Sequence, residues 1–391
     1  MPTAETTSLP SMVVEPWLER AAALRPDRSA VEAPDGRLTY AELLAAAGEA
    51  APGLAGRVEI EARPGIEFVV RLHACLLAGA RAVPVDERLG AAERAALGDA
   101  DGDLVVHTSG TTGAPRPVGL TKADIEANAW GTAAALGLTD DERWLCPLPL
   151  SHVGGLMVLL RSAVYATTAV LGPAATNDVT LASLVPTQLA RLLDAGAKPP
   201  SRAVLLGGAA ADPTLLSRAK EAGWPVAPSY GLTQTCSAAT IGEIGDTETS
   251  GRPIPGVTVT IAADDEIVVA VNGRTVHTGD LGRLDEHGRL VVIGRKTDTI
   301  VTGGENVAPA EVEAVLRAHP AVADAGVFAR PHPEWGEAVV ARVVLRADAT
   351  PDELRAFAAE RLARFKVPKA VELADALPRT KSGKLLRREL A

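Results

Sequence analysis

A run of small hydroxyl and glycine residues is the first feature of the sequence that could carry chemistry. HTSGTTGAPRPVGL, residues 107–120, follows the apolar LVV at 104–106. Glycine lets backbone N–H groups approach an anion closely, and successive N–H groups with Thr and Ser hydroxyls form a concave set of donors. Arg116 supplies a cation for phosphate oxygens. We interpret the segment as a phosphate-binding loop, with a polar surface turn as the alternative. It lacks the Walker glycine-lysine pattern.

A second segment, PSYGLTQTCS at 228–237, combines an aromatic ring with several hydroxyl groups after an expected strand. Tyr230 could stack on a purine, and Thr233 could donate a hydrogen bond to a phosphate. Gln234 is neutral and is therefore a poorer ligand for a hard cation than a carboxylate would be. A buried tyrosine followed by a polar turn explains this segment equally well when it is taken alone.

Three further segments carry polar groups at the ends of expected strands or helices. Asp280 and Arg295 each follow a glycine, and an Asp carboxylate suits the hydroxyls of a ribose. GGEN at 303–306 is a tight turn before an expected helix, and PRTKSGKLLRREL at 378–390 is basic. A basic terminal segment is by itself commonly a solvated helix end.

The elements that would position these groups alternate between strand and helix. Short β-rich runs at 81–86, 103–110, 168–172 and 202–208 are separated by helical patterns such as 122–136 and 212–223. LTYAEL at 38–43 is typical of a strand that enters a helix. This alternation predicts an α/β fold with layered, largely parallel sheets.

The pattern changes after residue 250 to shorter strand and turn units. Runs at 256–270 and 277–294 predict a small antiparallel, barrel-like sheet, the second run containing an Asp-Glu-His-Gly turn. Beyond it, two amphipathic helices (309–319 and 350–363) and two strands (325–331 and 338–347) predict a small α+β domain. We therefore expect a large domain at 1–295 and a small C-terminal domain at 296–391.

The composition narrows the classes of function. The 391 residues include 39 basic and 49 acidic side chains, giving a formal charge of −10, so no electrostatic footprint for nucleic acid or anionic lipid is present. The three cysteines are scattered singly, which predicts neither a zinc site nor a disulfide framework. We find no export signal and no apolar stretch long enough to span a membrane. A reducing cytoplasm fits best.

The five segments, in this order, resemble the adenylate-forming superfamily of acyl-CoA synthetases, peptide-synthetase adenylation domains and luciferases. The likeness runs from LTYAEL through CLLAGARAVPVDERL to PRTKSGKLLR. Within the superfamily, PLPLSHVGGLMVLLRSAV, SLVPTQLARLL, YGLTQTCS and TGGENVAPAEVE are most similar to the 2-succinylbenzoate–CoA ligases of menaquinone synthesis. The resemblance implies ATP, Mg²⁺ and coenzyme A as cofactors, and a small aromatic carboxylic acid as substrate.

The resemblance also assigns roles to residues of this sequence. It implies a nucleotide site built from Thr108, Ser109, Gly110, Thr111, Thr112, Gly113, Gly208, Ala209, Tyr230, Gly231, Thr233, Gln234, Asp280 and Arg295. Lys384, Thr233 and Arg116 are the implied catalytic residues, Lys384 bridging the attacking carboxylate and the α-phosphate. The implied acid-binding residues are His152, Gly155, Arg161, Ser229 and Ser237, with Thr187 and Gln188 as further polar candidates. Gly303 and Gly304 would line the thiol tunnel, and Thr297 would be the hinge about which a mobile C-terminal domain rotates.

The sequence departs from the family pattern in three places. Gln234 stands where the family usually has a glutamate that helps to hold Mg²⁺, so the metal ligands stay unknown. Arg116-Pro117 replaces the usual Lys-Gly, and the chain is shorter than typical members. Two alternatives stay open: an adenylation enzyme that loads a carrier protein, and a degenerate nucleotide-binding protein without turnover. A monomer and a homodimer are both compatible with the sequence.

Overall fold

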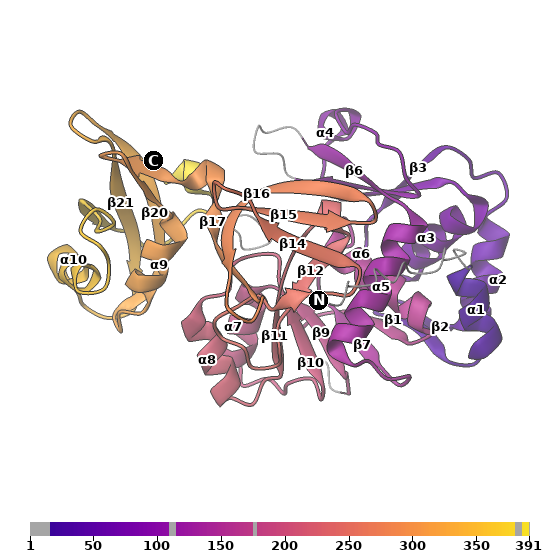
Figure 1. Ribbon diagram of the computed structural model, residues 1–391. Coiled ribbons are helices and arrows are strands. Elements are labelled where there is room, and N and C mark those ends of the chain that lie inside the picture. Colours follow the sequence, from indigo (N-terminus) through magenta and orange to yellow (C-terminus); the bar gives the residue numbers. More distant parts are fainter. Residues whose placement is uncertain (1–15, 109–114, 175–177, 380–384, 391) are drawn as a thin grey trace, which may run out of the picture.

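The computed structural model describes residues 16–108, 115–174, 178–379 and 385–390. Its strands form four sheets, three in the large N-terminal part and one in the C-terminal part (Figure 1). The prediction of layered α/β sheets with a barrel-like sheet and a small α+β domain is confirmed. Among the described helices, none has the length and apolar character needed to cross a membrane.

The largest sheet, which we call the large sheet, is mostly parallel. Its strands in spatial order are β13 (Arg252–Pro253), β12 (Ser237–Ile241), β11 (Val226–Leu232), β10 (Ala203–Leu206), β9 (Leu181–Leu184), β7 (Arg143–Cys146), β8 (Thr168–Leu171), β1 (Ser29–Ala33) and β2 (Gly36–Thr39). β1 and β7 to β11 run parallel to one another, whereas β12, β13 and β2 add antiparallel pairs at the two edges.

Helices cover both faces of the large sheet, which explains its continuous apolar strands. Side chains alternate across a strand, so Leu205 of β10 joins one hydrophobic cluster while Val204 and Leu206 join another. The second cluster is closed by α7 (Pro186–Asp194) and α8 (Pro213–Glu221). The first is closed by α1 (Trp17–Leu24), α2 (Tyr40–Ala50), α3 (Ile66–Ala78), α5 (Lys122–Leu136) and α6 (Val153–Tyr165).

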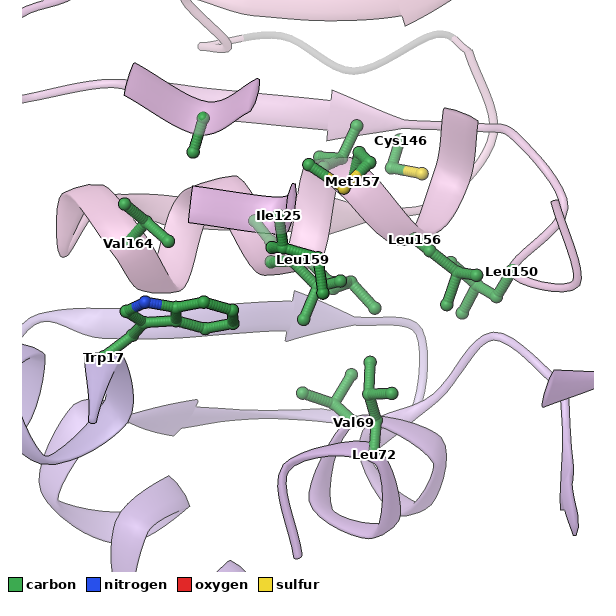
Figure 2. Close-up of a cluster of buried hydrophobic side chains, with 14 of the residues drawn as sticks. Trp17, Val69, Leu72, Ile125, Cys146, Leu150, Leu156, Met157, Leu159 and Val164 are labelled. Carbon is green, nitrogen blue, oxygen red and sulfur yellow. The ribbon is translucent and has the colours of Figure 1, made fainter. Parts of the chain in front are cut away.

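Helix α6 lies at the centre of the first cluster. Figure 2 shows the α6 side chains of Leu156, Met157, Leu159 and Val164. Around them lie residues contributed by α1, α3 and α5, namely Trp17, Val69, Leu72 and Ile125. Leu156, Met157 and Leu160 are fully buried. An apolar helix in this position fixes the place of the polar residues that it also carries.

Two further sheets complete the large part. The small sheet contains β3 (Arg57–Glu61), β4 (Arg81–Val85), β5 (Leu104–Thr108) and β6 (Arg116–Leu120), with the short helix α4 (Ala91–Ala95) after β4. The barrel-like sheet contains β14 (Val257–Ile261), β15 (Glu266–Val271), β16 (Arg274–Leu284) and β17 (Leu290–Arg295), all antiparallel.

The C-terminal part is formed around its own sheet. That sheet contains β18 (Ile300–Thr302), β19 (Glu305–Val307), β20 (Val322–His332), β21 (Gly336–Leu345) and β22 (Ala370–Leu373). Helices α9 (Pro309–Arg317) and α10 (Pro351–Ala359) pack on it through a separate hydrophobic cluster. Figure 1 shows this part beside the barrel-like sheet, and the Arg317 guanidinium reaches back to Asp212 at 2.6 Å.

Candidate active site

The candidate site lies at one edge of the large sheet. β7, β9, β10 and β11 are parallel, so their carboxyl ends meet at the same edge. The segments that follow β7, β9 and β10 carry His152, Gln188 and Gly208 respectively, and Tyr230 lies near the carboxyl end of β11 itself. Residues separated by about eighty positions in the sequence are thereby gathered at one place, as the α/β interpretation requires.

Tyr230, Asp280 and Arg295 form a connected polar group at this edge. The Tyr230 hydroxyl donates to Asp280 Oδ2 at 2.8 Å, and Arg295 Nε lies 2.9 Å from Asp280 Oδ1. Asp280 and Arg295 face each other across β16 and β17, whereas Tyr230 belongs to β11 of the large sheet. Burial, with the neighbouring Asp280 carboxylate, raises the pKa of Tyr230 above its usual range, so Tyr230 stays protonated.

The turn after β11 presents Thr233 and Gln234. It is the 3-10 helix η1 (Thr233–Thr235), in which Thr233 is half-buried and Gln234 is exposed. Gly231 is required here, because a Cβ at that position would lie 1.8 Å from the Ser237 carbonyl oxygen. Close approach of β11 and β12 thus folds the chain back and leaves the Thr233 hydroxyl and the Gln234 amide at the sheet edge.

The expected phosphate loop connects β5 and β6. Thr108 ends β5 and Arg116 begins β6, and the Thr108 hydroxyl donates to the Arg116 carbonyl at 3.3 Å. The base of this hairpin lies beside η1, since β6 contacts η1. Ser109, Gly110, Thr111, Thr112 and Gly113 lie outside the described residues, as does Lys384.

Of the residues expected to surround the adenine, Gly208 and Ala209 follow β10, and Tyr230 lies within β11. Gly208 and Ala209 are exposed, and Gly208 adopts φ +79°. Ser229, which was expected in the acid pocket, also lies in β11. Its hydroxyl donates to the Leu206 carbonyl at 3.0 Å, which joins β11 to β10. Gln188 bonds the Val185 N–H and the Pro147 carbonyl, so its amide already holds neighbouring loops together.

The residues expected to meet the acid divide into two groups. His152 is the exposed residue before α6, and Ser237 is half-buried at the start of β12. Gly155 allows close packing, because a Cβ there would lie 2.5 Å from the Pro149 carbonyl oxygen. Arg161, in contrast, is only 1% exposed, and its Nη2 donates to Asn128 Oδ1 at 2.6 Å. The structure places Arg161 inside the core rather than on an open surface.

Two charged residues that the sequence did not indicate as functional lie near His152. Desolvation lowers the pKa of His152, Asp86 opposes this shift, and Arg88 adds to it. Asp86 and Arg88 form an ion pair in the loop after β4; both lie in the CLLAGARAVPVDERL run that carries the family likeness, but nothing in that run assigns them a role. Desolvation and Arg88 therefore favour the neutral form of the imidazole.

The remaining predicted residues lie in and before the C-terminal part. Thr297 is exposed in the 3-10 helix η2 (Lys296–Asp298), between β17 and β18. Gly303 and Gly304, with φ of +60° and +85°, form the two-residue turn of the β18–β19 hairpin. Arg387, close to the C-terminus, donates to both carboxylate oxygens of Glu313 at 2.8 and 2.7 Å.

The described residues offer little for a protein-held metal. In the part of the chain that is described, no group of three or more His, Cys, Asp or Glu side chains could surround an ion. Gln234 provides an amide oxygen, a weaker ligand for Mg²⁺ than a carboxylate. These residues fit a Mg²⁺ that arrives with the phosphates of a nucleotide and do not fit a resident metal centre.

Comparison with known proteins gives matches along nearly the whole chain. Residues 18–106 and 101–292 match the AMP-binding enzyme family, and residues 311–384 match the AMP-binding enzyme C-terminal domain. The 2-succinylbenzoate–CoA ligase of Bacillus mycoides (strain KBAB4) is 33% identical over 468 residues, which cover 96% of this chain and 97% of the relative.

Two solved structures show the same architecture. The o-succinylbenzoate CoA synthetase (MenE) from Bacillus subtilis, in complex with the acyl-adenylate intermediate OSB-AMP, matches with a TM-score of 0.85 and 32% identity, covering 96% of this chain and 97% of that chain. The same enzyme in complex with ATP and magnesium ion matches with a TM-score of 0.84 and 32% identity, covering 96% and 98%.

Proposed function

The chain belongs to the AMP-binding enzyme family, and from this premise we propose that it converts 2-succinylbenzoate to its acyl-adenylate with MgATP and then transfers the acyl group to coenzyme A. The observation that carries the proposal is the match, over 96% of the chain, to an enzyme solved with the acyl-adenylate of this acid. The reaction class is that of an AMP-forming acid–CoA ligase. It belongs to menaquinone synthesis.

In the first step a carboxylate oxygen of the acid attacks the α-phosphorus of ATP. A bond forms between that oxygen and phosphorus, the bond from the α-phosphorus to the bridging oxygen breaks, and pyrophosphate leaves. We assign the ribose to Asp280 and Arg295, the adenine to Tyr230, Gly208 and Ala209, and the α-phosphate to Thr233. Such a reaction needs no protein nucleophile, so catalysis rests on positioning and charge neutralisation.

Cations complete the adenylation site in this proposal. Arg116, at the base of the β5–β6 hairpin, and Lys384 would neutralise charge on the phosphates and the attacking carboxylate. The outer phosphates would be bound by the hairpin loop, residues 108–113. Mg²⁺ would enter bound to ATP, because the described residues do not supply a cage for it.

In the second step the coenzyme A thiolate attacks the acyl carbonyl carbon, the bond from that carbon to the AMP oxygen breaks, and AMP leaves. We propose that residues 296–391 rotate about Thr297 between the steps. In support, Thr297 lies in the exposed link between β17 and β18, and the C-terminal part has its own hydrophobic cluster. Gly303 and Gly304 would then approach the thiol.

We assign the acid pocket to the loops around His152, Gly155, Ser229 and Ser237. In its neutral form, His152 can donate a hydrogen bond without adding charge beside the carboxylate that reacts. We place the enzyme in the cytoplasm, where ATP and coenzyme A are available and where its buried free thiols stay reduced.

The test is pyrophosphate release from MgATP with 2-succinylbenzoate, benzoate and a fatty acid, each with and without coenzyme A. We expect thioester only with 2-succinylbenzoate, and strong loss of pyrophosphate release in Lys384→Ala. Activation of another acid in preference to 2-succinylbenzoate would show the acid to be wrong. An adenylate that coenzyme A cannot discharge would instead indicate a carrier-protein acceptor.

A further inference from the structure

The turn that carries Thr233 and Gln234 has a strained backbone conformation at its C-terminal end. Cys236 has φ 56° and Ser237 has φ 87°, so two consecutive residues with side chains occupy the left-handed region. Such residues cost free energy and persist only where their surroundings hold them. The turn therefore needs contacts that fix it.

Asn128 of α5 supplies contacts on both sides of the strained pair. Its Nδ2 donates to the Thr235 carbonyl at 3.2 Å and to the Ala238 carbonyl at 2.8 Å. These carbonyls flank Cys236 and Ser237 in the sequence. The Asn128 side chain, which is 3% exposed, thus joins the end of η1 to the start of β12 and spans the two strained residues.

Arg161 of α6 fixes the orientation of this amide. Its Nη2 donates to Asn128 Oδ1 at 2.6 Å, and a guanidinium can only donate, so the Asn128 oxygen must face Arg161 and the NH₂ must face the turn. The guanidinium also lies over the Trp144 ring, 5.5 Å from its centroid. Trp144 in turn donates to the Ser183 hydroxyl at 3.0 Å, so the chain of contacts is anchored in β7 and β9.

The burial of the charged Arg161 side chain costs free energy. It is 1% exposed, and within the described residues its contacts are an amide oxygen and an aromatic ring, with no carboxylate to balance its charge. A buried cation without an ionic partner destabilises a fold, so its presence calls for another role. Orienting Asn128 is such a role, because the turn that Asn128 holds lies at the candidate site.

We propose that Asn128, oriented by Arg161, is a positioning residue that holds the strained Thr233–Ser237 turn so that Thr233 faces the phosphate of the nucleotide. The inference rests on the proposed function in one respect, namely the role of Thr233. Neither residue contacts the nucleotide in this assignment. Both act through the turn.

The chain offers a matched control on the same helix. Thr132 lies one turn after Asn128 on α5, is 0% exposed, and its hydroxyl has no hydrogen-bond partner within the described part of the chain. Thr132→Val changes a buried polar group of α5 without altering the contacts of Arg161 with Asn128 or of Asn128 with the turn. Asn128→Asp keeps the shape and the acceptor facing Arg161 but removes both donors to the turn.

The first experiment is hydrogen exchange, which does not depend on activity. Asn128→Asp and Arg161→Met are expected to speed exchange of the amides of residues 232–238 relative to wild type and Thr132→Val, because the Leu232 N–H and the Cys236 N–H are bonded within the turn. Arg161→Lys keeps a donor and is expected to lie between wild type and Arg161→Met. Unchanged exchange over 232–238 would overturn the proposal.

The second experiment is ATP–pyrophosphate exchange with 2-succinylbenzoate, expressed per folded enzyme. Asn128→Asp should lower kcat roughly 10- to 100-fold, as misplacement of a contacting group by about 1 Å does. The KM for ATP should change by less than about threefold, since Tyr230 and Asp280 still bind the nucleoside. Thr132→Val should match wild type.

A double variant shows whether the effect passes through Thr233. In a Thr233→Val background, Asn128→Asp should cause no further loss of kcat, because the hydroxyl that it positions is already absent. Losses that multiply would overturn the proposal. A wild-type enzyme that forms no adenylate would refute the proposed function. The hydrogen-exchange result would still decide whether Asn128 and Arg161 hold the turn.

Discussion

Replacement of Asp280 by Asn tests the assignment of the nucleotide site most directly. Asp280 is 6% exposed, accepts from the Tyr230 hydroxyl and pairs with Arg295. The isosteric amide keeps the side-chain volume but removes the negative charge, and it leaves Arg295 facing a neutral group. In the proposed complex, the same change weakens a charge-assisted hydrogen bond to the ribose.

The magnitude follows from the contacts. Hydrogen bonds to charged groups contribute about 1.5–3 kcal/mol, which corresponds to a roughly 10- to 150-fold weaker affinity for ATP. The Arg295 side chain is 38% exposed, so solvent screens its pair with Asp280, and we expect a loss of unfolding free energy of only about 1 kcal/mol. The effect on ATP should therefore exceed the effect on stability.

The assay is ATP–pyrophosphate exchange with varied ATP at saturating acid, with urea denaturation of the same samples. Tyr230→Phe is the matched control, because it removes one donor to Asp280 and leaves the carboxylate with Arg295. We expect Tyr230→Phe to raise the KM for ATP by about 2- to 10-fold, less than Asp280→Asn does.

The reasoning is refuted if Asp280→Asn changes the KM for ATP less than twofold while remaining folded. A rise in the KM for the acid alone would also refute it, because Asp280 would then belong to the acid pocket. Equal effects of the two variants would indicate that the Tyr230 hydroxyl, and not the carboxylate charge, carries the interaction.

Three other predictions concern the two parts of the chain and its titrating groups. Asp212→Asn keeps the helix cap but weakens the 2.6 Å pair with Arg317, so limited proteolysis should cut the link between the two parts faster than in wild type, and an unchanged rate would show the pair to be dispensable. The pKa of Asp86 is lowered to about 2, chiefly by its hydrogen bond with Arg88, so its contribution to stability is present above about pH 4 and lost as the pH falls toward 2. Urea denaturation should therefore separate Asp86→Asn from wild type by less than about 1 kcal/mol at pH 7, and this difference should vanish as the pH falls through about 2. The three cysteines are buried, and burial raises the pKa of Cys146 to about 12, so at pH 8 a thiol reagent should titrate them only after denaturation, and fast native labelling would contradict this burial.

The sequence by itself determined the fold class and the places of most elements. Strand runs such as 202–208 and helical runs such as 122–136 became β10 and α5. β10 is a short apolar run of the kind that is buried on both faces of a parallel sheet, and α5 begins directly after Thr121, whose side chain accepts from the Asp124 N–H. The start expected for the helix at 350–363 is also correct, because the structure shows Thr350 and Glu353 forming a capping box there. Local chemistry was sufficient for these features, since each depends on neighbours a few positions away.

The order of motifs indicated the family, but it could not show which side chains meet. Tyr230, Asp280 and Arg295 were assigned separately, and only the packing of β11 against the barrel-like sheet makes them one hydrogen-bonded group. Asn128 carried no signal at all, since a polar residue in a helical run is usually exposed.

Tertiary structure also decided the environment of groups that the sequence could only name. Arg161 was expected to meet the acid, and the packing of α6 into the core instead directs it to Asn128. His152 acquires its lowered pKa from desolvation and from Arg88, sixty-four positions away in the chain. Burial and long-range contacts arise only when the layers close, and for that reason no periodicity or spacing in the sequence contains them.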